Sequence, residues 1–296
     1  MNFSIISPYP PLRGGISKET EILCELLLSK KHKIKVISFK KLYPNILFPG
    51  KSQYLINPKI NNFINCKSII NTLSPFTWRK TYLEIISGNP DYILFRYWSP
   101  ILIPVYLYLT NRLKNSKSTT KIFCICDNVF PHEKSNFVDK YLVKRMLKNF
   151  DGIFTMSKNV TNIIKNQLPL SKVETIFLPI KTDYGPSISK EIALKKLNIN
   201  ASKAILFFGL IRDYKGLDIL IKACKKLMCN NDDCKLIIAG ECYQNKNKYL
   251  TLIKDLKLSN KIVWFDEYID DKKVNLFFSA CDLVVLPYTY YYQAFS

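Results

Sequence analysis

Short apolar strands alternate with helical patterns from one end of the chain to the other. Each predicted strand is a nearly continuous apolar run, which is typical of parallel sheets whose two faces are both covered by helices. Six strands are predicted in the first part of the chain and four in the second, which indicates an α/β fold with two doubly wound, parallel-sheet (Rossmann-like) domains. The predicted strands are Phe3–Ile6, Ile34–Phe39, Tyr92–Phe95, Lys121–Cys126, Gly152–Thr155, Val173–Phe177, Ala204–Phe208, Lys235–Ala239, Ile262–Phe265 and Leu283–Leu286.

A stretch with the composition of a hinge separates the two groups of strands. Residues 179–189 contain two prolines, a glycine and two serines, as segments between domains often do. We therefore place an N-terminal domain in residues 1–183 and a C-terminal domain in residues 184–296. With 296 residues, of which 48% are hydrophobic, the chain is long enough to bury two cores. The last predicted strand is not followed by closing helices, so we expect the second domain to be incomplete and the sequence to be truncated.

The chain is strongly basic. It has 44 lysine and arginine residues against 23 aspartate and glutamate residues, a formal net charge of +21. Such a charge favours anionic partners: nucleic acid, an anionic membrane surface or phosphorylated substrates. The lysines are scattered, without the dense basic run or the arginine–aromatic cluster that is typical of RNA-binding surfaces. We therefore expect no nucleic-acid partner and a largely solvated basic surface.

The nine cysteines are irregularly spaced. The pair at 124 and 126 has the spacing of neither a zinc site nor a redox CxxC motif, and the pair at 229 and 234 has no second pair of ligands nearby. Reduced thiols and no metal site are expected, as in a cytoplasmic protein. The first apolar segment lacks the basic flank of a signal peptide, and the most apolar window, Tyr92–Leu109, is interrupted by Arg96 and two prolines.

The turn after the seventh predicted strand is the strongest candidate for a binding site. The strand Ala204–Phe208 ends at Gly209, two cations follow at Arg212 and Lys215, and an amphipathic helix then begins near Leu217. Free backbone N–H groups and the positive end of the helix dipole meet at such a point. The turn is therefore expected to bind a phosphate or a diphosphate.

Three other strand ends carry suggestive residues, because ligands of doubly wound sheets bind at the carboxyl ends of strands. Gly14 and Gly15 precede a helix after the first strand, where they allow a ligand to approach the backbone but also fit an ordinary turn. Asp127 and His132 follow the fourth strand; His132 fits a loop or capping role as well as a site role. The loop after the last strand, at Pro287 and Tyr288, also fits simple apolar packing.

Taken together, these motifs resemble the large group of retaining glycosyltransferases called family 4, over essentially the whole chain. Residues 10–16 (PPLRGGI) resemble the glycine-rich loop of the acceptor-side domain. Residues 127–133 (DNVFPHE) are similar to a "DNVxPHE" or "HNVxPHE" signature of one branch. Residues 209–216 match "GxIRxYKG", the most specific motif of the chain. The resemblance implies the GT-B architecture, in which two Rossmann-like domains face a cleft.

The resemblance also assigns roles to individual residues. It implies that Arg212 and Lys215 contact the donor diphosphate, and that the segment 265–269 lies beside the nucleotide base. Many relatives have histidine where this chain has Asp127, so the role of that imidazole does not carry over. The expected catalytic residues are Arg212, Lys215, His132 and Asp127, and the expected donor-binding residues are Gly14, Gly15, Gly209, Gly240, Glu241, Tyr268 and Gln293.

The implied activity is transfer of a sugar from a nucleotide diphosphate sugar to a glycan or lipid-linked acceptor, with retention of configuration and without a metal. The donor is a co-substrate, and no cofactor is expected. No Asp-x-Asp motif follows a strand end, and Asp270 and Asp271 fit a helix start better. Scattered lysines on the first domain would hold a cytoplasmic protein peripherally on the anionic inner face of a membrane.

Other functions fit the same residues. A sugar-nucleotide epimerase or a phosphorylase can use the same two-domain architecture, because a fold does not determine the reaction. An inactive fragment that only binds a nucleotide or a carbohydrate is a second alternative. Nucleic-acid binding is the weakest, since it depends on net charge alone.

Overall fold

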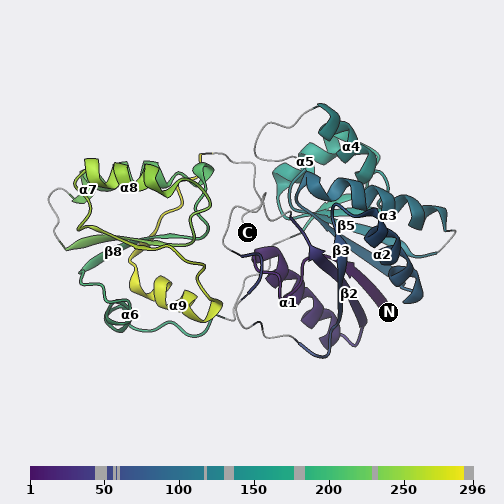
Figure 1. Cartoon of the computed structure of the whole chain (residues 1–296), viewed down its shortest axis with the longest axis horizontal. Helices are drawn as coiled ribbons and strands as arrows, with labels where there is room; N and C mark the ends of the chain where they lie inside the picture. Colours follow the sequence, from purple (N-terminus) through teal and green to yellow (C-terminus); the bar gives the residue numbers. More distant parts are fainter. Residues whose placement is uncertain are drawn as a thin grey trace. The chain divides into compact units, whose positions relative to one another are not determined.

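A computed structural model of the chain describes residues 1–43, 52–55, 58, 61–116, 119–129, 137–176, 184–228 and 233–289; the side chains at positions 137 and 138 are not included. The chain divides into two compact units between residues 178 and 179 (Figure 1). Each unit is built around its own parallel sheet.

The first unit contains a seven-stranded parallel sheet with the strand order β3-β2-β1-β4-β5-β6-β7. The order reverses between β1 and β4, which is the switch point of a doubly wound sheet. The strands are β1 (Asn2–Ile6), β2 (Lys33–Lys41), β3 (Asn65–Asn71), β4 (Tyr92–Tyr97), β5 (Lys121–Cys126), β6 (Gly152–Thr155) and β7 (Val173–Thr175).

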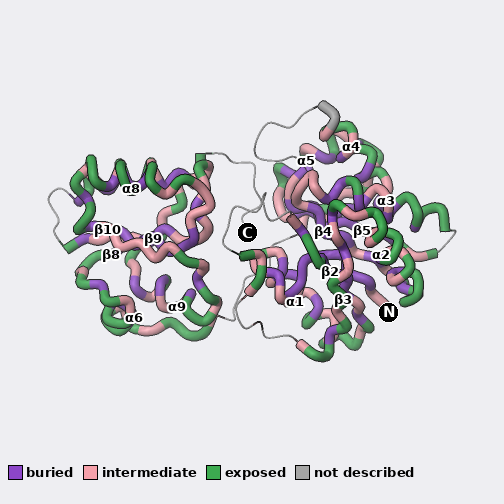
Figure 2. The backbone as a smooth tube through the Cα atoms, in the orientation of Figure 1, coloured by how far each residue is buried: buried purple, intermediate pink, exposed green. Residues whose placement is uncertain are grey.

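Helices cover both faces of this sheet. Ile5 and Ile6 are neighbours in β1 but belong to different buried clusters, because successive side chains of a strand point to opposite faces. The clusters lie along the sheet and the inward sides of the helices (Figure 2). The helices are α1 (Gly15–Ser29), α2 (Pro75–Ser87), the short 3₁₀ helix η2 (Pro100–Leu102), α3 (Ile103–Asn115), α4 (Phe137–Leu147) and α5 (Lys158–Gln167).

The strand β3 is absent from the sequence prediction. It lies at the edge of the sheet, where it pairs with β2 alone, and most of its residues are exposed or half-buried. An edge strand can carry polar residues such as Asn65, Lys67 and Ser68. The long apolar run that identified the other strands is therefore missing here.

The second unit contains a four-stranded parallel sheet with the strand order β10-β9-β8-β11. Helices α7 and α8 lie on one side of it and α6 and α9 on the other (Figure 1), each side with its own buried cluster. The strands are β8 (Lys203–Phe208), β9 (Cys234–Ala239), β10 (Ile262–Phe265) and β11 (Leu283–Val284), and the helices are α6 (Lys190–Lys196), the 3₁₀ helix η3 (Asp213–Lys215), α7 (Leu217–Met228), α8 (Lys246–Asp255) and α9 (Asp271–Ala280). The predicted α/β fold with two doubly wound parallel sheets is confirmed.

Side-chain caps mark where several helices begin. The Asp270 carboxylate accepts a hydrogen bond from the backbone N–H of Lys272 at 2.9 Å, which confirms the expected N-cap of α9. Ser157, Ser189 and Asn245 cap α5, α6 and α8 in the same way. Within the described ranges, no helix has the length and apolar character needed to cross a membrane.

Candidate functional site

Two glycines bring the turns after β8 and β9 into direct contact. The backbone N–H of Gly209 donates to the carbonyl of Ala239 at 2.9 Å. Gly209 has φ +107° and Gly240 has φ +152°, conformations that favour glycine. A Cβ atom on Gly240 would lie 2.0 Å from the carbonyl oxygen of Gly209. Only a residue without a side chain therefore fits at position 240.

Arg212 and Lys215 are held by the short helix η3 immediately after this turn. The Nζ atom of Lys215 lies 3.2 Å from the position of a Cβ on Gly209, so the ammonium folds back over the glycine. It also lies 5.7 Å from the ring centre of Tyr288, while the Arg212 guanidinium lies 5.5 Å from the ring centre of Tyr243. The two cations thus rest against aromatic faces at the carboxyl end of the sheet.

The electrostatics of this turn favour an anion. Burial, and next to it the positive charge of Arg212, lower the pKa of Lys215 from 10.5 to about 8. Asp213, which lies between the two cations in sequence, pairs instead with Lys248 at 3.0 Å and accepts a hydrogen bond from Tyr249 at 3.3 Å. In the part of the chain that the structure describes, no carboxylate forms an ion pair with Arg212 or Lys215. The positive charge of Arg212 and Lys215 is therefore available to bind an anionic ligand.

The helix α7 begins at the end of the same turn. Gly216 precedes it with φ +69°, and a Cβ on Gly216 would lie 2.0 Å from the carbonyl oxygen of Pro287. The backbone N–H of Thr289 donates to the carbonyl of Tyr214 at 2.9 Å. The loop after β11 thus packs on η3, and the amino end of α7 adds its dipole to the charge of the two cations.

The turns after β9 and β10 complete this edge of the sheet. The backbone N–H of Ile211 donates to the carbonyl of Glu241 at 3.0 Å, and Glu241 itself is only 2% exposed. The Asp266 carboxylate accepts from the backbone N–H of Cys242 and pairs with Lys246, both at 2.9 Å. Asp266 lies in the segment 265–269 that was expected beside the nucleotide base, but its contacts were not predicted; its position directly after the strand β10 is the signal that could have identified it.

Most of the predicted donor-side residues are therefore on one edge of the second sheet. The structure brings together Gly209, Arg212, Lys215, Gly240 and Glu241. Tyr268 lies half-buried in the loop between β10 and α9. Gln293 lies outside the described residues. Their roles in binding a donor stay predictions.

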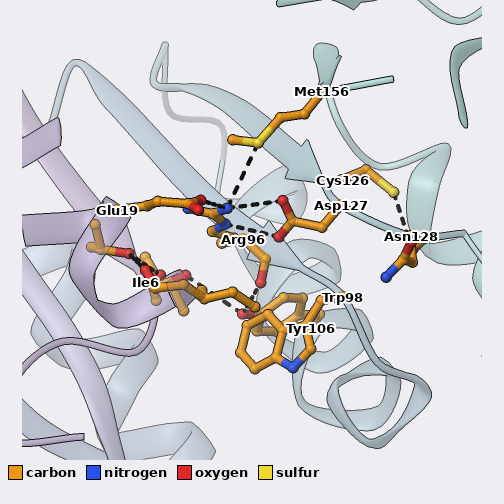
Figure 3. Close-up of polar contacts among 12 residues, drawn as sticks. Ile6, Glu19, Arg96, Trp98, Tyr106, Cys126, Asp127, Asn128 and Met156 are labelled. Carbon is orange, nitrogen blue, oxygen red and sulfur yellow. Dashed lines mark hydrogen bonds and ion pairs between the residues drawn. The ribbon is translucent and has the colours of Figure 1, made fainter. Parts of the chain in front are cut away.

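In the first unit, Asp127 belongs to a buried group of three charges (Figure 3). Arg96, at the end of β4, donates through Nε to Asp127 Oδ2 at 2.8 Å and through Nη2 to Asp127 Oδ1 at 2.9 Å. The same Nη2 atom donates to Glu19 Oε2, from the first turns of α1. The Arg96 side chain therefore ties the ends of β4 and β5 to α1.

This group holds two carboxylates against one guanidinium. Burial raises the pKa of Asp127, and the charge of Glu19 adds to this although Arg96 acts in the opposite direction. The second oxygen of Glu19, Oε1, is buried and has no hydrogen-bond partner in the described structure. Two carboxylates thus share one guanidinium in a low-dielectric interior.

The position of Asp127 limits what it can do. The residue is 9% exposed and both of its carboxylate oxygens accept hydrogen bonds from Arg96, so it anchors the residues that directly follow β5. His132 itself lies outside the described residues. The catalytic roles of Asp127 and His132 stay predictions.

Arg96 and Glu19 were not predicted from the sequence. A cation inside an apolar strand is a signal that could have identified Arg96, but nothing in the helical pattern distinguishes Glu19.

The glycine pair of the first unit lies where the sequence predicted it, between β1 and α1. Gly14 has φ +123° and no atom within 4 Å of the position of a Cβ, and Gly15 is the first residue of α1. The backbone is therefore open to solvent at this point, and only conformation requires glycine at position 14.

Residues 189–295 match the family "Glycosyl transferases group 1". The chain is 26% identical over 182 residues to YtcC of Bacillus subtilis (strain 168), a glycosyltransferase by name, a match that covers 56% of this chain and 44% of the relative.

Two solved structures have the same fold over the whole chain. Sucrose-phosphate synthase from Thermosynechococcus elongatus superposes with a TM-score of 0.73 at 14% identity, over 100% of this chain and 77% of that one. HepE of Anabaena, in complex with UDP and glucose, superposes with a TM-score of 0.68 at 12% identity, over 99% of this chain and 76% of that one. The chain therefore shares the fold of these solved structures, and residues 189–295 are similar to the family "Glycosyl transferases group 1".

Proposed function

We propose that this protein transfers a sugar from a nucleotide diphosphate sugar to a glycan or lipid-linked acceptor, with retention of configuration and without a metal ion. The observation that carries the proposal is the turn at residues 209–216. Two cations without a carboxylate partner in the described structure lie there beside a glycine turn and the start of α7. This arrangement suits a diphosphate better than a single negative charge.

The chemistry of sugar transfer matches what these groups can supply. Breaking the bond between the anomeric carbon and the phosphate oxygen builds positive charge on the sugar and negative charge on the leaving diphosphate. Arg212, Lys215 and the amino end of α7 would stabilise the developing negative charge. The lowered pKa of Lys215 shows that its charged form is poorly compensated in the free protein, so an incoming anion relieves that cost.

Retention and metal independence are further parts of the proposal. Two fixed cations and a helix terminus would take the electrostatic part that a metal ion plays at other diphosphate sites. The acceptor hydroxyl would attack on the face from which the diphosphate leaves, and the leaving phosphate would take the hydroxyl proton. Such a step needs no nucleophile from the protein.

The comparisons support a nucleotide donor. The HepE structures contain UDP, UDP-glucose, or UDP and glucose, and this chain shares their fold. We propose a cytoplasmic enzyme that meets its acceptor peripherally at an anionic membrane surface, with no nucleic-acid partner. The net charge of +21 favours this location.

Calorimetry with UDP, GDP and ADP and with their glucose conjugates tests the donor site. We expect binding of at least one nucleotide, weakened about 100-fold in Arg212→Gln or Lys215→Met, since each removes a charge-assisted contact. Lys254→Met removes an exposed lysine of α8 and serves as the control. If none of the nucleotides binds, the proposal is wrong.

The reaction is tested by nucleotide release. Release that requires a glycan or lipid-linked acceptor supports transfer, whereas interconversion of the donor without an acceptor indicates an epimerase. Tight binding with no turnover across acceptors indicates a protein that only binds nucleotides. The anomeric configuration of the product, read by NMR, tests retention, and full activity in excess EDTA tests metal independence.

A further inference from the structure

The outer face of α2, in the first unit, carries large apolar side chains that are exposed in the described part of the chain. Phe76 is 90% exposed, Leu83 47% and Ile86 41%, and Leu73, just before the helix, is 62% exposed. Other exposed apolar residues are mostly dispersed singly, which is normal for a protein surface. Here four of them fall within fourteen positions, along the outside of the unit (Figure 2).

The spacing places these side chains in one stripe. Phe76 and Leu83 are seven positions apart, which is two helical turns, and Arg79 and Lys80 lie between them on either side. Both cations are exposed. We call Leu73, Phe76, Arg79, Lys80, Leu83 and Ile86 the α2 outer surface.

The opposite side of α2 already supplies the contacts that hold the helix on the unit. Thr81 and Ile85 are fully buried. The indole N–H of Trp78 donates to the carbonyl of Asn71 at 2.9 Å, and the Arg112 guanidinium lies 5.4 Å from the ring centre of Tyr82. The helix is therefore apolar on two faces, and only one of them is needed for packing.

The charge around the α2 outer surface is predominantly positive. Glu84 is the only acidic residue between positions 61 and 90. It pairs with both Lys35 and Lys67, which lower its pKa by hydrogen bonding. Lys40 and Lys41, exposed at the end of β2, lie next to the end of β3, where Lys41 is in register with Asn71. Among the described residues, Arg79, Lys80, Lys40 and Lys41 thus form no ion pair with a carboxylate, because Glu84 is taken up by Lys35 and Lys67.

We propose that the α2 outer surface binds an anionic lipid bilayer, with Phe76 and Leu83 entering the boundary between headgroups and acyl chains and Arg79 and Lys80 contacting lipid phosphates. An apolar stripe bordered by cations is the pattern of helices that lie in a membrane interface. A second copy of the chain fits less well, because a two-fold contact would place Arg79 and Lys80 against the same cations. The inference gives the membrane contact of the proposed function a specific surface.

Vesicle flotation of the full chain tests the proposal. Vesicles of phosphatidylcholine alone are compared with vesicles that also contain phosphatidylglycerol, and we expect binding to the anionic vesicles only, weakened by salt. Phe76→Ser should lower the partition coefficient about tenfold. Arg79→Gln with Lys80→Gln should lower it about fivefold for each charge removed.

Two matched controls separate this surface from general charge and hydrophobicity. Leu170→Ser removes a fully exposed apolar side chain from another part of the same unit. Lys195→Gln with Lys196→Gln removes two cations from α6. Neither control should change vesicle binding. All four variants should have the same unfolding temperature as the native protein, because the altered side chains are exposed.

Three outcomes would overturn the proposal: absence of binding to anionic vesicles, equal losses in the controls, or a concentration-dependent dimer that disappears in Phe76→Ser while vesicles do not bind. The measurement uses no nucleotide. A failure of vesicle binding therefore contradicts only the membrane proposal and not the donor proposal. A failure of nucleotide binding contradicts only the donor proposal.

Discussion

Binding of a nucleoside diphosphate should be accompanied by proton uptake at Lys215. Burial, followed by the nearby charge of Arg212, lowers the pKa of this lysine from 10.5 to about 8. A diphosphate on the turn would favour the charged ammonium and raise the pKa again. At about pH 8.5 roughly three-quarters of Lys215 is neutral in the free protein, so binding should take up about three-quarters of a proton.

The same lowered pKa makes Lys215 a cost to the folded protein. The folded pKa lies below the unfolded value, so between about pH 8 and 10.5 the unfolded state binds more protons and the free energy of unfolding rises with pH. Below this window the charged lysine lowers the free energy of unfolding by at most about 3 kcal/mol. Lys215→Met should therefore unfold at higher urea concentration than the native protein at neutral pH, and the difference should shrink as the pH approaches 10.5.

Calorimetry of UDP binding at about pH 8.5, in buffers with different ionisation enthalpies, measures the proton uptake directly. UDP itself is fully ionised at this pH, because the second phosphate ionisation lies near pH 6. Lys215→Arg keeps the charge and should bind UDP with no uptake, whereas Lys215→Met should bind weakly. Uptake near zero in the native protein, or equal uptake in Lys215→Arg, would refute the reasoning.

Two further predictions concern stability. Arg96→Met leaves the buried carboxylates of Glu19 and Asp127 without a cation and should lower the free energy of unfolding by about 3–5 kcal/mol. Adding Glu19→Gln and Asp127→Asn to this variant should restore most of the lost stability. A loss below about 1 kcal/mol for Arg96→Met alone, measured by urea unfolding, would contradict the importance of these ion pairs. Gly240→Ala forces a Cβ into the Gly209 carbonyl and strains the backbone, so it should cost more than the roughly 1–3 kcal/mol expected from strain alone. Gly14→Ala, which meets no atom within 4 Å, shows the strain by itself, and equal losses in the two variants would mean that the close contact between the turns contributes nothing.

The sequence predicted those features that depend on short segments. Strands such as Lys121–Cys126 and Gly152–Thr155 were identified with the observed bounds, because a strand buried on both faces must be apolar throughout. The turn at residues 209–216 was also predicted from a short segment, because Gly209, Arg212, Lys215 and the start of α7 follow one another within nine positions. The residues of such short segments can therefore be interpreted without knowing which other parts of the chain pack against them.

Other features depend on partners that are distant in sequence. Arg96 meets Asp127 across 31 positions and Glu19 across 77, and no local pattern pairs them. The role of Gly240 follows from its contact with Gly209, and the edge strand β3 is a strand because β2 supplies its hydrogen bonds. Local residue order determined the elements and the turn at residues 209–216, whereas the packing of those elements decided which charges are buried together, since burial and pairing exist only after the chain has folded.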